Sequence, residues 1–134
     1  MAVIDLTRAN RVEIVESIEQ MTLAAAESIT PGMAVRIEGD RFTKANGTTA
    51  GEAAAYGIAT GDVVAVAGMA ITAVKQGVLD GYELSGDTGA SVYLSDTDGR
   101  LDTAAGTVSK VVGTIIPGTA QPRGTTHKLL RVGV

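Results

Sequence analysis

Apolar and polar residues alternate over several short stretches of the chain, and this period of two is typical of half-buried β-strands. Residues 33–37 (Met-Ala-Val-Arg-Ile) and 91–95 (Ser-Val-Tyr-Leu-Ser) show the alternation most clearly. Further short runs are rich in apolar or β-branched residues: 63–67, 70–74, 109–116 and 129–132. Glycine, proline, aspartate or threonine bounds each run, as expected for turns. From residue 30 onward the pattern predicts an all-β fold, either a sandwich or a barrel.

A weak internal repeat relates residues 32–45 to residues 89–104. Both stretches read as a strand, a tight turn, an arginine, a large apolar residue and a polar strand, and a glycine-centred strand follows each. The aligned pairs are Val35 with Val92, Ile37 with Leu94 and Gly57 with Gly113. Two similar β units that share one core are therefore expected.

The first 29 residues allow two interpretations. Residues 11–26 could form an amphipathic helix, because five apolar residues have helical spacing: Ile14, Val15, Ile18, Met21 and Ala25. The same stretch is rich in β-branched residues, which favours a strand, and only Asn10 precedes it as a candidate helix cap. The sequence leaves both alternatives open.

This leading segment carries much apolar surface, which must be buried somewhere. We expect residues 1–29 to form an extended arm beside a barrel domain of residues 30–134, and a chain that starts at Thr30 to fold by itself. The arm could complete its own barrel or bind a neighbouring subunit. The candidate interface residues in the arm are Val3, Ile4, Leu6, Val12 and Ile14.

Composition narrows the function. The chain has 134 residues, the size of one domain, and 45% of them are apolar but only 3% aromatic. The core is therefore expected to consist of valine, isoleucine, leucine and alanine. The net charge is −4, and the shortage of basic and aromatic residues argues against nucleic-acid binding. With no cysteine, the chain has no disulfide and no thiolate site. The longest uncharged stretches, 63–74 and 111–122, are too short to span a membrane.

Charge is unevenly distributed along the chain. Residues 1–29 hold five acids and two bases, whereas residues 105–134 hold four bases and no acid. A basic end on an acidic protein is a candidate docking surface, although these residues could equally be solvated. The candidate contacts in this region are Arg123, Lys128 and Arg131.

One motif resembles a catalytic one. Asp87-Thr88-Gly89 followed by alanine is found in retroviral-type aspartic proteases, where two subunits each supply one Asp and the pair shares a proton. Here Ser85-Gly86 replaces the two apolar residues that normally precede the motif. The second landmark, residues 111–113, follows too soon to leave room for a flap. A turn before the next strand explains the motif without catalysis.

The remaining motifs are weaker. Residues 77–82 faintly resemble one loop of trimeric dUTP pyrophosphatases, but further phosphate loops are missing. Residues 96–102 place three carboxylates on one turn without the other ligands of a calcium loop. His127 is the only histidine, and no phosphate-binding or dinucleotide motif is present. We therefore predict no catalytic residue, no cofactor and no metal site, and we do not expect an enzyme.

The order of the strand motifs resembles that of capsid cement proteins, also called head decoration proteins, of tailed bacteriophages. The string from Val92 to Leu101, Val-Tyr-Leu-Ser-Asp-Thr-Asp-Gly-Arg-Leu, carries most of the likeness. Residues 30–37, 55–59, 78–82 and 111–117 add to it, so that the resemblance covers residues 30–134 and includes the leading arm more loosely.

The resemblance implies a small β-barrel of the tulip or SH3-like kind and an assembly, usually a homotrimer, on the outer surface of the icosahedral head. The partners would be the major capsid protein and further copies of the chain itself, with no nucleic acid and no membrane. The protein would be located on the virion surface after synthesis in the host cytoplasm. Synthesis in the cytoplasm agrees with the charged start of the sequence, which does not resemble a signal peptide.

An alternative is a carbohydrate- or receptor-binding β module of a phage tail or surface. The low aromatic content disfavours this alternative, because sugar sites favour aromatic platforms. The retroviral-type protease is the third and weakest candidate.

Overall fold

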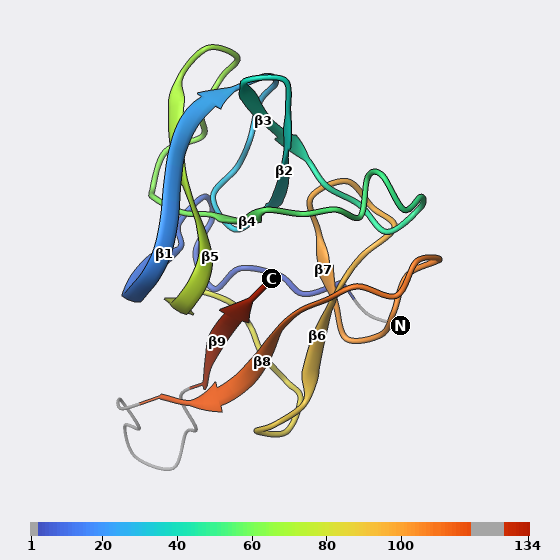
Figure 1. Cartoon of the computed structure of the whole chain (residues 1–134). Helices are drawn as coiled ribbons and strands as arrows, with labels where there is room; N and C mark the ends of the chain where they lie inside the picture. Colours follow the sequence, from blue (N-terminus) through green and yellow to red (C-terminus); the bar gives the residue numbers. More distant parts are fainter. Residues whose placement is uncertain (1–2, 119–127) are drawn as a thin grey trace.

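The structure, a computed structural model, describes residues 3–118 and 128–134. This part of the chain contains nine β-strands and no helix, so the predicted all-β class is confirmed (Figure 1). Residues 11–26, which could have been a helix, contain the longest strand of the fold. The strands are β1 (Glu13–Ala25), β2 (Ala34–Glu38), β3 (Arg41–Lys44), β4 (Gly57–Ala59), β5 (Ala70–Asp80), β6 (Ser91–Leu94), β7 (Leu101–Asp102), β8 (Val111–Pro117) and β9 (Lys128–Gly133).

The order of strands in the sheet reveals the predicted repeat. The order is β1-β3-β2-β4-β5-β9-β8-β6-β7, so β3-β2-β4-β5 on one side mirrors β7-β6-β8-β9 on the other. In the first unit Val35 lies opposite Gly57, and in the second Val92 lies opposite Gly113. The sequence repeat aligned Val35 with Val92 and Gly57 with Gly113, so the two cross-strand pairs occupy equivalent positions in the two units. The two units join where β5 pairs with β9.

Strand β1 has no counterpart in the second unit. It pairs antiparallel with β5 along most of its length and parallel with β3 at Ala24 and Ala25. These two pairings close β1, β3, β2, β4 and β5 into a ring of five strands. The first unit is therefore barrel-like, whereas β9, β8, β6 and β7 extend from β5 as a curved sheet (Figure 1).

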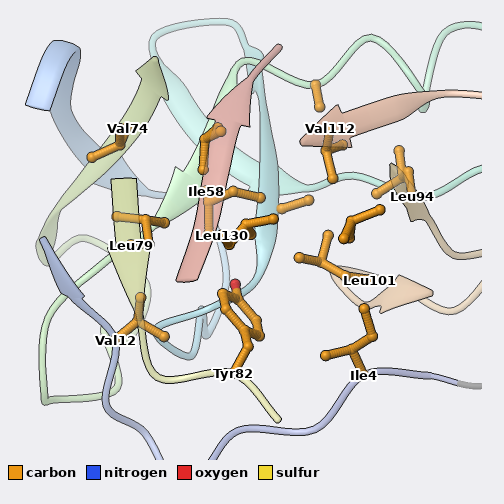
Figure 2. Packing of buried hydrophobic residues seen from close by; sticks show 14 of the residues in the cluster. Ile4, Val12, Ile58, Val74, Leu79, Tyr82, Leu94, Leu101, Val112 and Leu130 are labelled. Atoms are coloured by element: carbon orange, nitrogen blue, oxygen red, sulfur yellow. The ribbon is translucent and has the colours of Figure 1, made fainter. Parts of the chain in front are cut away.

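Two apolar clusters fill the fold. The smaller cluster surrounds Phe42 inside the ring of five strands. It contains four alanines, whose small side chains leave space for the phenyl group: Ala25, Ala59, Ala65 and Ala73. The larger cluster joins the two units and is built from aliphatic side chains and Tyr82 (Figure 2). Members shown in Figure 2 include Val12, Ile58, Leu79, Leu94, Leu101 and Leu130. The predicted aliphatic core is therefore present.

The leading segment is part of this core and links the two units. The backbone N–H of Ile4 donates to Leu101 in the second unit (2.9 Å), and that of Val12 donates to Gly61 in the first (2.9 Å). The side chains of Ile4, Val12 and Ile29 are buried. Residues on both sides of the expected boundary at 29/30 consequently contribute to the same apolar clusters. A chain starting at Thr30 would lack these core side chains and the strand that closes the ring. That such a chain folds by itself stays a prediction.

Candidate binding surface

The most exposed element of the fold is strand β1. Ten consecutive residues from Glu13 to Thr22 are exposed, although they belong to a regular strand. One edge of this stretch pairs with β5, whereas the pairing with β3 begins only at Ala24. The other edge of residues 13–23 therefore has no strand beside it among the described residues. We call this stretch the β1 edge.

Three register shifts interrupt the pairing of the β1 edge with β5, and two of them are bulges in β1. Ile14 lies opposite Leu79 and Glu16 opposite Val78, so Val15 is an extra residue in β1. Ile18 is a second extra residue, between the pairs Ser17–Gly77 and Glu19–Gln76. A bulge adds one residue to one strand and redirects the side chains around it.

The bulges change which residues share a face of the sheet. Without them, residues three apart on a strand would point to opposite faces. With them, Glu13, Glu16 and Glu19 lie opposite three β5 residues spaced two apart, Asp80, Val78 and Gln76. Residues directly opposite each other lie on the same face, so the three glutamates form one acidic row on the outer face.

Apolar side chains accompany this acidic row. The exposed fractions are 40% for Ile14, 57% for Val15, 70% for Ile18 and 40% for Met21. Ile14 pairs with the buried Leu79, on the face opposite to the glutamates, whereas Val15 and Ile18 are the bulge residues beside Glu16 and Glu19. Exposed apolar side chains that cluster on an edge strand are typical of a protein interface.

A surface hollow of about 480 Å³ adjoins the row and crosses from β1 to β8. Glu16 and Ile18 line one side of it, and Arg131 of β9 and Ile116 of β8 line the other. Val78 lies between Glu16 and Arg131, because it is paired with both. The hollow thus has an apolar floor, with an acid on one side and a base on the other.

The structure distributes the predicted arm residues over two environments. Ile4 and Val12 are buried in the core, and Leu6 packs against it, so these three side chains complete the chain's own fold. Val3 and Ile14 remain exposed. Of the two alternatives for the arm, burial within the chain's own fold holds for Ile4 and Val12 and in part for Leu6, whereas Val3 and Ile14 are exposed and available to a partner.

The structure also leaves fewer basic side chains available to a partner than the sequence predicted. The Lys128 ammonium donates to the carbonyl of Gly86 (2.6 Å) and is half-buried, so it stabilises the link between β5 and β6. Arg131 is exposed and lines the hollow beside Glu16. Arg123 lies outside the described residues. Lys128 is thus occupied within the chain, whereas Arg131 is accessible.

Sequence reasoning treated Val15, Ile18 and Met21 only as a possible helix face and did not identify Glu16 and Glu19. A signal for them exists in the sequence: residues 12–20 repeat a valine or isoleucine followed by glutamate every three residues. A period of three fits neither a regular strand nor a regular helix. It fits a strand with a bulge in each repeat.

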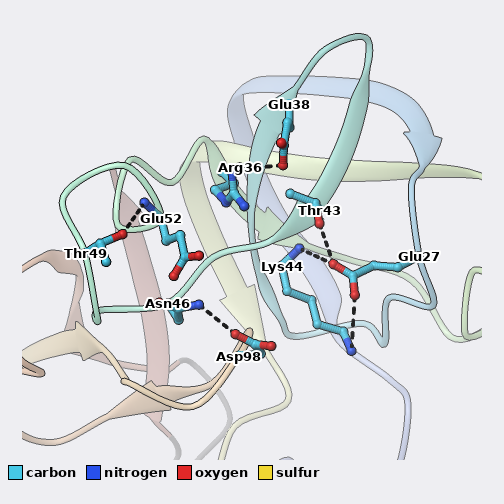
Figure 3. A network of polar contacts seen from close by, with 9 residues as sticks. All are labelled: Glu27, Arg36, Glu38, Thr43, Lys44, Asn46, Thr49, Glu52 and Asp98. Carbon is cyan, nitrogen blue, oxygen red and sulfur yellow. Dashed lines mark hydrogen bonds and ion pairs between the residues drawn. The ribbon is translucent and has the colours of Figure 1, made fainter.

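Polar contacts fix the hairpin of β2 and β3 against the rest of the fold (Figure 3). Glu27 accepts a hydrogen bond from the hydroxyl of Thr43 and another from the backbone N–H of Lys44 (3.2 Å). The hydrogen bond from Thr43 and the charge of Lys44 hold the pKa of Glu27 below its ordinary value. Nearby, Asn46 donates to Asp98 in the second unit. These bonds are structural, since each connects segments distant in sequence.

The pKa values of two tyrosines are raised by their surroundings. Tyr82 is buried and donates to the carbonyl of Gly32, and its burial raises the pKa of its phenol far above the ordinary value. Burial also raises the pKa of Tyr56, and the negative charge of Glu19 adds to this effect. The Lys75 ammonium lies over the ring of Tyr56 at 5.5 Å. The acidic potential of the β1 edge therefore extends to Tyr56.

The motifs that resembled catalytic or metal sites lie in turns. In Asp87-Thr88-Gly89, the N–H of Gly89 donates to Ile115 and that of Ala90 to Asp87, which forms the turn before β6. Both carboxylate oxygens of Asp96 accept hydrogen bonds from Thr107 (2.8 Å each). Residues 3–118 and 128–134 contain no group of three acidic, histidine or cysteine side chains arranged to hold a metal ion.

Comparisons with known proteins do not assign the chain to a family. Comparison with protein-family models, with curated protein sequences and with solved structures finds no match. In the described part of the chain there is no helix long and apolar enough to cross a membrane. The β1 edge and the hollow beside it are the main basis for a functional proposal.

Proposed function

We propose that this protein is a capsid cement protein, which binds the outside of an icosahedral phage head and stabilises the contacts between major capsid subunits. The proposal includes assembly as a homotrimer at local three-fold positions. One observation carries it: a 13-residue strand, β1, exposes apolar side chains along an edge that no other strand of the described chain covers. An adhesive protein requires such a surface, because its burial on a partner provides the binding energy.

The binding free energy expected from this apolar surface is appropriate for a protein present in many copies. Covering the exposed parts of Ile14, Val15, Ile18 and Met21 would remove roughly 200 Å² of apolar area from water. At about 25 cal/mol per Å² this contributes roughly 5 kcal/mol before ordering costs. A single such contact is weak, but a trimer that engages several capsid subunits gains by multivalency.

The alternative of a carbohydrate-binding module finds no supporting feature in the described surface. Such sites favour exposed aromatic rings, but Phe42 and Tyr82 are buried and Tyr56 and Tyr93 are half-buried. The aspartic protease alternative is tested directly by Asp87→Asn, which would abolish proteolysis and leave a cement protein unaffected.

The test is to add the purified full-length protein to expanded heads of its phage that lack it, and to image them by cryo-EM. Protrusions at three-fold positions and a higher temperature of head disruption are expected. Val15→Ser/Ile18→Ser should weaken binding because it removes the apolar contact. The matched control is Val63→Ser/Val66→Ser, which changes two comparably exposed valines in the loop between β4 and β5. Bare heads after incubation with wild-type protein, or turnover of a substrate, would refute the proposal.

A further inference from the structure

Two carboxylates of the acidic row form no ion pair among the described residues, although Arg131 lies across the hollow from Glu16. Glu13 forms an ion pair with Arg11, but no ion pair with Glu16 or Glu19 occurs among the described residues. Residues 12–35 include no lysine or arginine. The β1 edge therefore offers two exposed carboxylates next to two exposed apolar side chains, those of Val15 and Ile18.

We propose that the β1 edge binds an extended segment of the partner protein that carries lysine or arginine side chains at alternate positions, with apolar residues beside them. This inference rests on the proposed function, in which the partner is the major capsid protein. The carboxylates of Glu16 and Glu19 favour basic residues in the partner segment. The exposed side chains of Val15 and Ile18 favour apolar residues in it. The open backbone edge selects a strand, because a strand can supply the hydrogen bonds that a sheet edge lacks.

The spacing supports an extended partner. Glu16 and Glu19 lie opposite Val78 and Gln76, which are two residues apart on β5. Their separation along the sheet is therefore one two-residue step, about 7 Å. Residues i and i+2 of an added strand have the same spacing and point to the same face. Two basic residues at these positions would each face one glutamate as a cross-strand pair.

The same features disfavour pairing of two β1 edges from different copies. In such a pair glutamates would face glutamates, and like charges directly opposite each other are destabilising. The edge is therefore selective for a basic partner, and another copy's β1 is not its occupant.

The hollow gives the partner segment a second contact. The hollow lies beside Glu16 on the same face as the acidic row, and Val78 and Ile116 line it. A part of the partner that extends over this face, beyond the added strand, can place an apolar side chain in it. Arg131 on the far side would repel a base at that position.

The experiment measures co-sedimentation of the full-length protein with expanded heads that lack it, over a range of salt concentrations. Wild-type binding should weaken as salt rises, because exposed charge pairs are screened. Glu16→Lys/Glu19→Lys should bind at least about tenfold more weakly, since each substitution replaces an attraction by a repulsion. Glu16→Gln/Glu19→Gln should show an intermediate loss and a flatter salt dependence.

The matched control is Asp40→Lys/Glu83→Lys, which changes the net charge equally at two exposed acids outside β1. It should bind like the wild type. Equal loss in this control would show an effect of net charge alone and would overturn the inference. Undiminished binding of Glu16→Lys/Glu19→Lys, with wild-type binding intact, would overturn it while leaving the cement function standing. If the wild-type protein itself does not bind, both proposals fail.

Discussion

The side-chain amide of Asn46 donates a hydrogen bond of 2.6 Å to the carboxylate of Asp98. Asn46 follows β3 in the first unit and is buried, whereas Asp98 lies in the β6–β7 turn of the second. The amide oxygen of Asn46 accepts from the N–H of Thr48 (3.1 Å) and from its hydroxyl. Both ends of the amide are thus used, and the orientation of the side chain is fixed.

Asn46→Asp should destabilise the fold by about 2–3 kcal/mol, because two carboxylates would then face each other where a donor is needed. Denaturation by urea at pH 7 measures the change. Asn46→Asp/Asp98→Asn exchanges donor and acceptor and should recover most of the loss. Failure of this double variant to recover stability would contradict the assigned role of the pair.

Gly57 and Gly113, the glycines aligned by the sequence repeat, each permit close contact with the next strand. A Cβ at Gly57 would lie 2.2 Å from the carbonyl oxygen of Val74, and one at Gly113 would lie 2.4 Å from that of Arg131. Gly57→Ala and Gly113→Ala should each cost about 3 kcal/mol, since the obstructing atoms are backbone. Gly51→Ala, where a Cβ meets nothing within 4 Å, is the control and should change the thermal midpoint little.

Tyr82→Phe should cost about 1–2 kcal/mol, because the carbonyl of Gly32 loses its buried donor. Since burial raises the pKa of Tyr82, the neutral phenol is favoured in the folded state. The stability that depends on this neutral form is present below about pH 10, the ordinary pKa, and is lost as the pH rises further.

Alkaline titration of absorbance at 295 nm tests this second expectation. The difference between the wild type and Tyr82→Phe isolates the ionisation of Tyr82. This ionisation should occur over the same pH range as the loss of the β-strand signal in circular dichroism. Ionisation of Tyr82 in a folded protein would show that the phenol is accessible.

Thr43→Val should destabilise the protein by about 0.5–1 kcal/mol at pH 7, because Glu27 loses its main donor at a partly exposed site. Since the pKa of Glu27 is lowered in the fold, the contribution of this contact is present above the ordinary glutamate pKa of about 4.3. It is lost as the pH falls through the lower, folded value. The difference between wild type and variant should therefore narrow at pH 3, as measured by urea denaturation. A difference that stays constant from pH 7 to pH 3 would exclude Glu27 as the acceptor.

Local patterns were sufficient to predict the two β units. Alternation in residues 91–94 matches the burial of β6, in which Val92 and Leu94 are buried. In residues 33–37 the strand was predicted correctly, but Ile37 is exposed, and Ala34 and Val35 are both buried. The alignment of Gly57 with Gly113 was also informative, because both positions face the backbone of a neighbouring strand. These requirements are local, so they leave a direct record in the sequence.

The leading segment could not be predicted in the same way. Its repeat of three residues agrees with neither the strand nor the helix period, and only the register with β5 shows that Val15 and Ile18 are bulges. Likewise, Ile4, Val12 and Ile14 are all apolar in sequence, but the first two are buried and the third is exposed. Which apolar residue is buried depends on what packs over it, and here the covering residues are distant in the chain.

The sequence by itself determined the all-β class, the two repeated units and the aliphatic core, because strand period, turn residues and side-chain size act over short distances. Only the tertiary structure decided that the first residues link both units, that β1 closes a ring, and that Glu16 and Glu19 share one exposed face with Glu13. The physical reason is that these features depend on pairing between strands far apart in sequence, and such pairing is fixed only when the whole core is assembled.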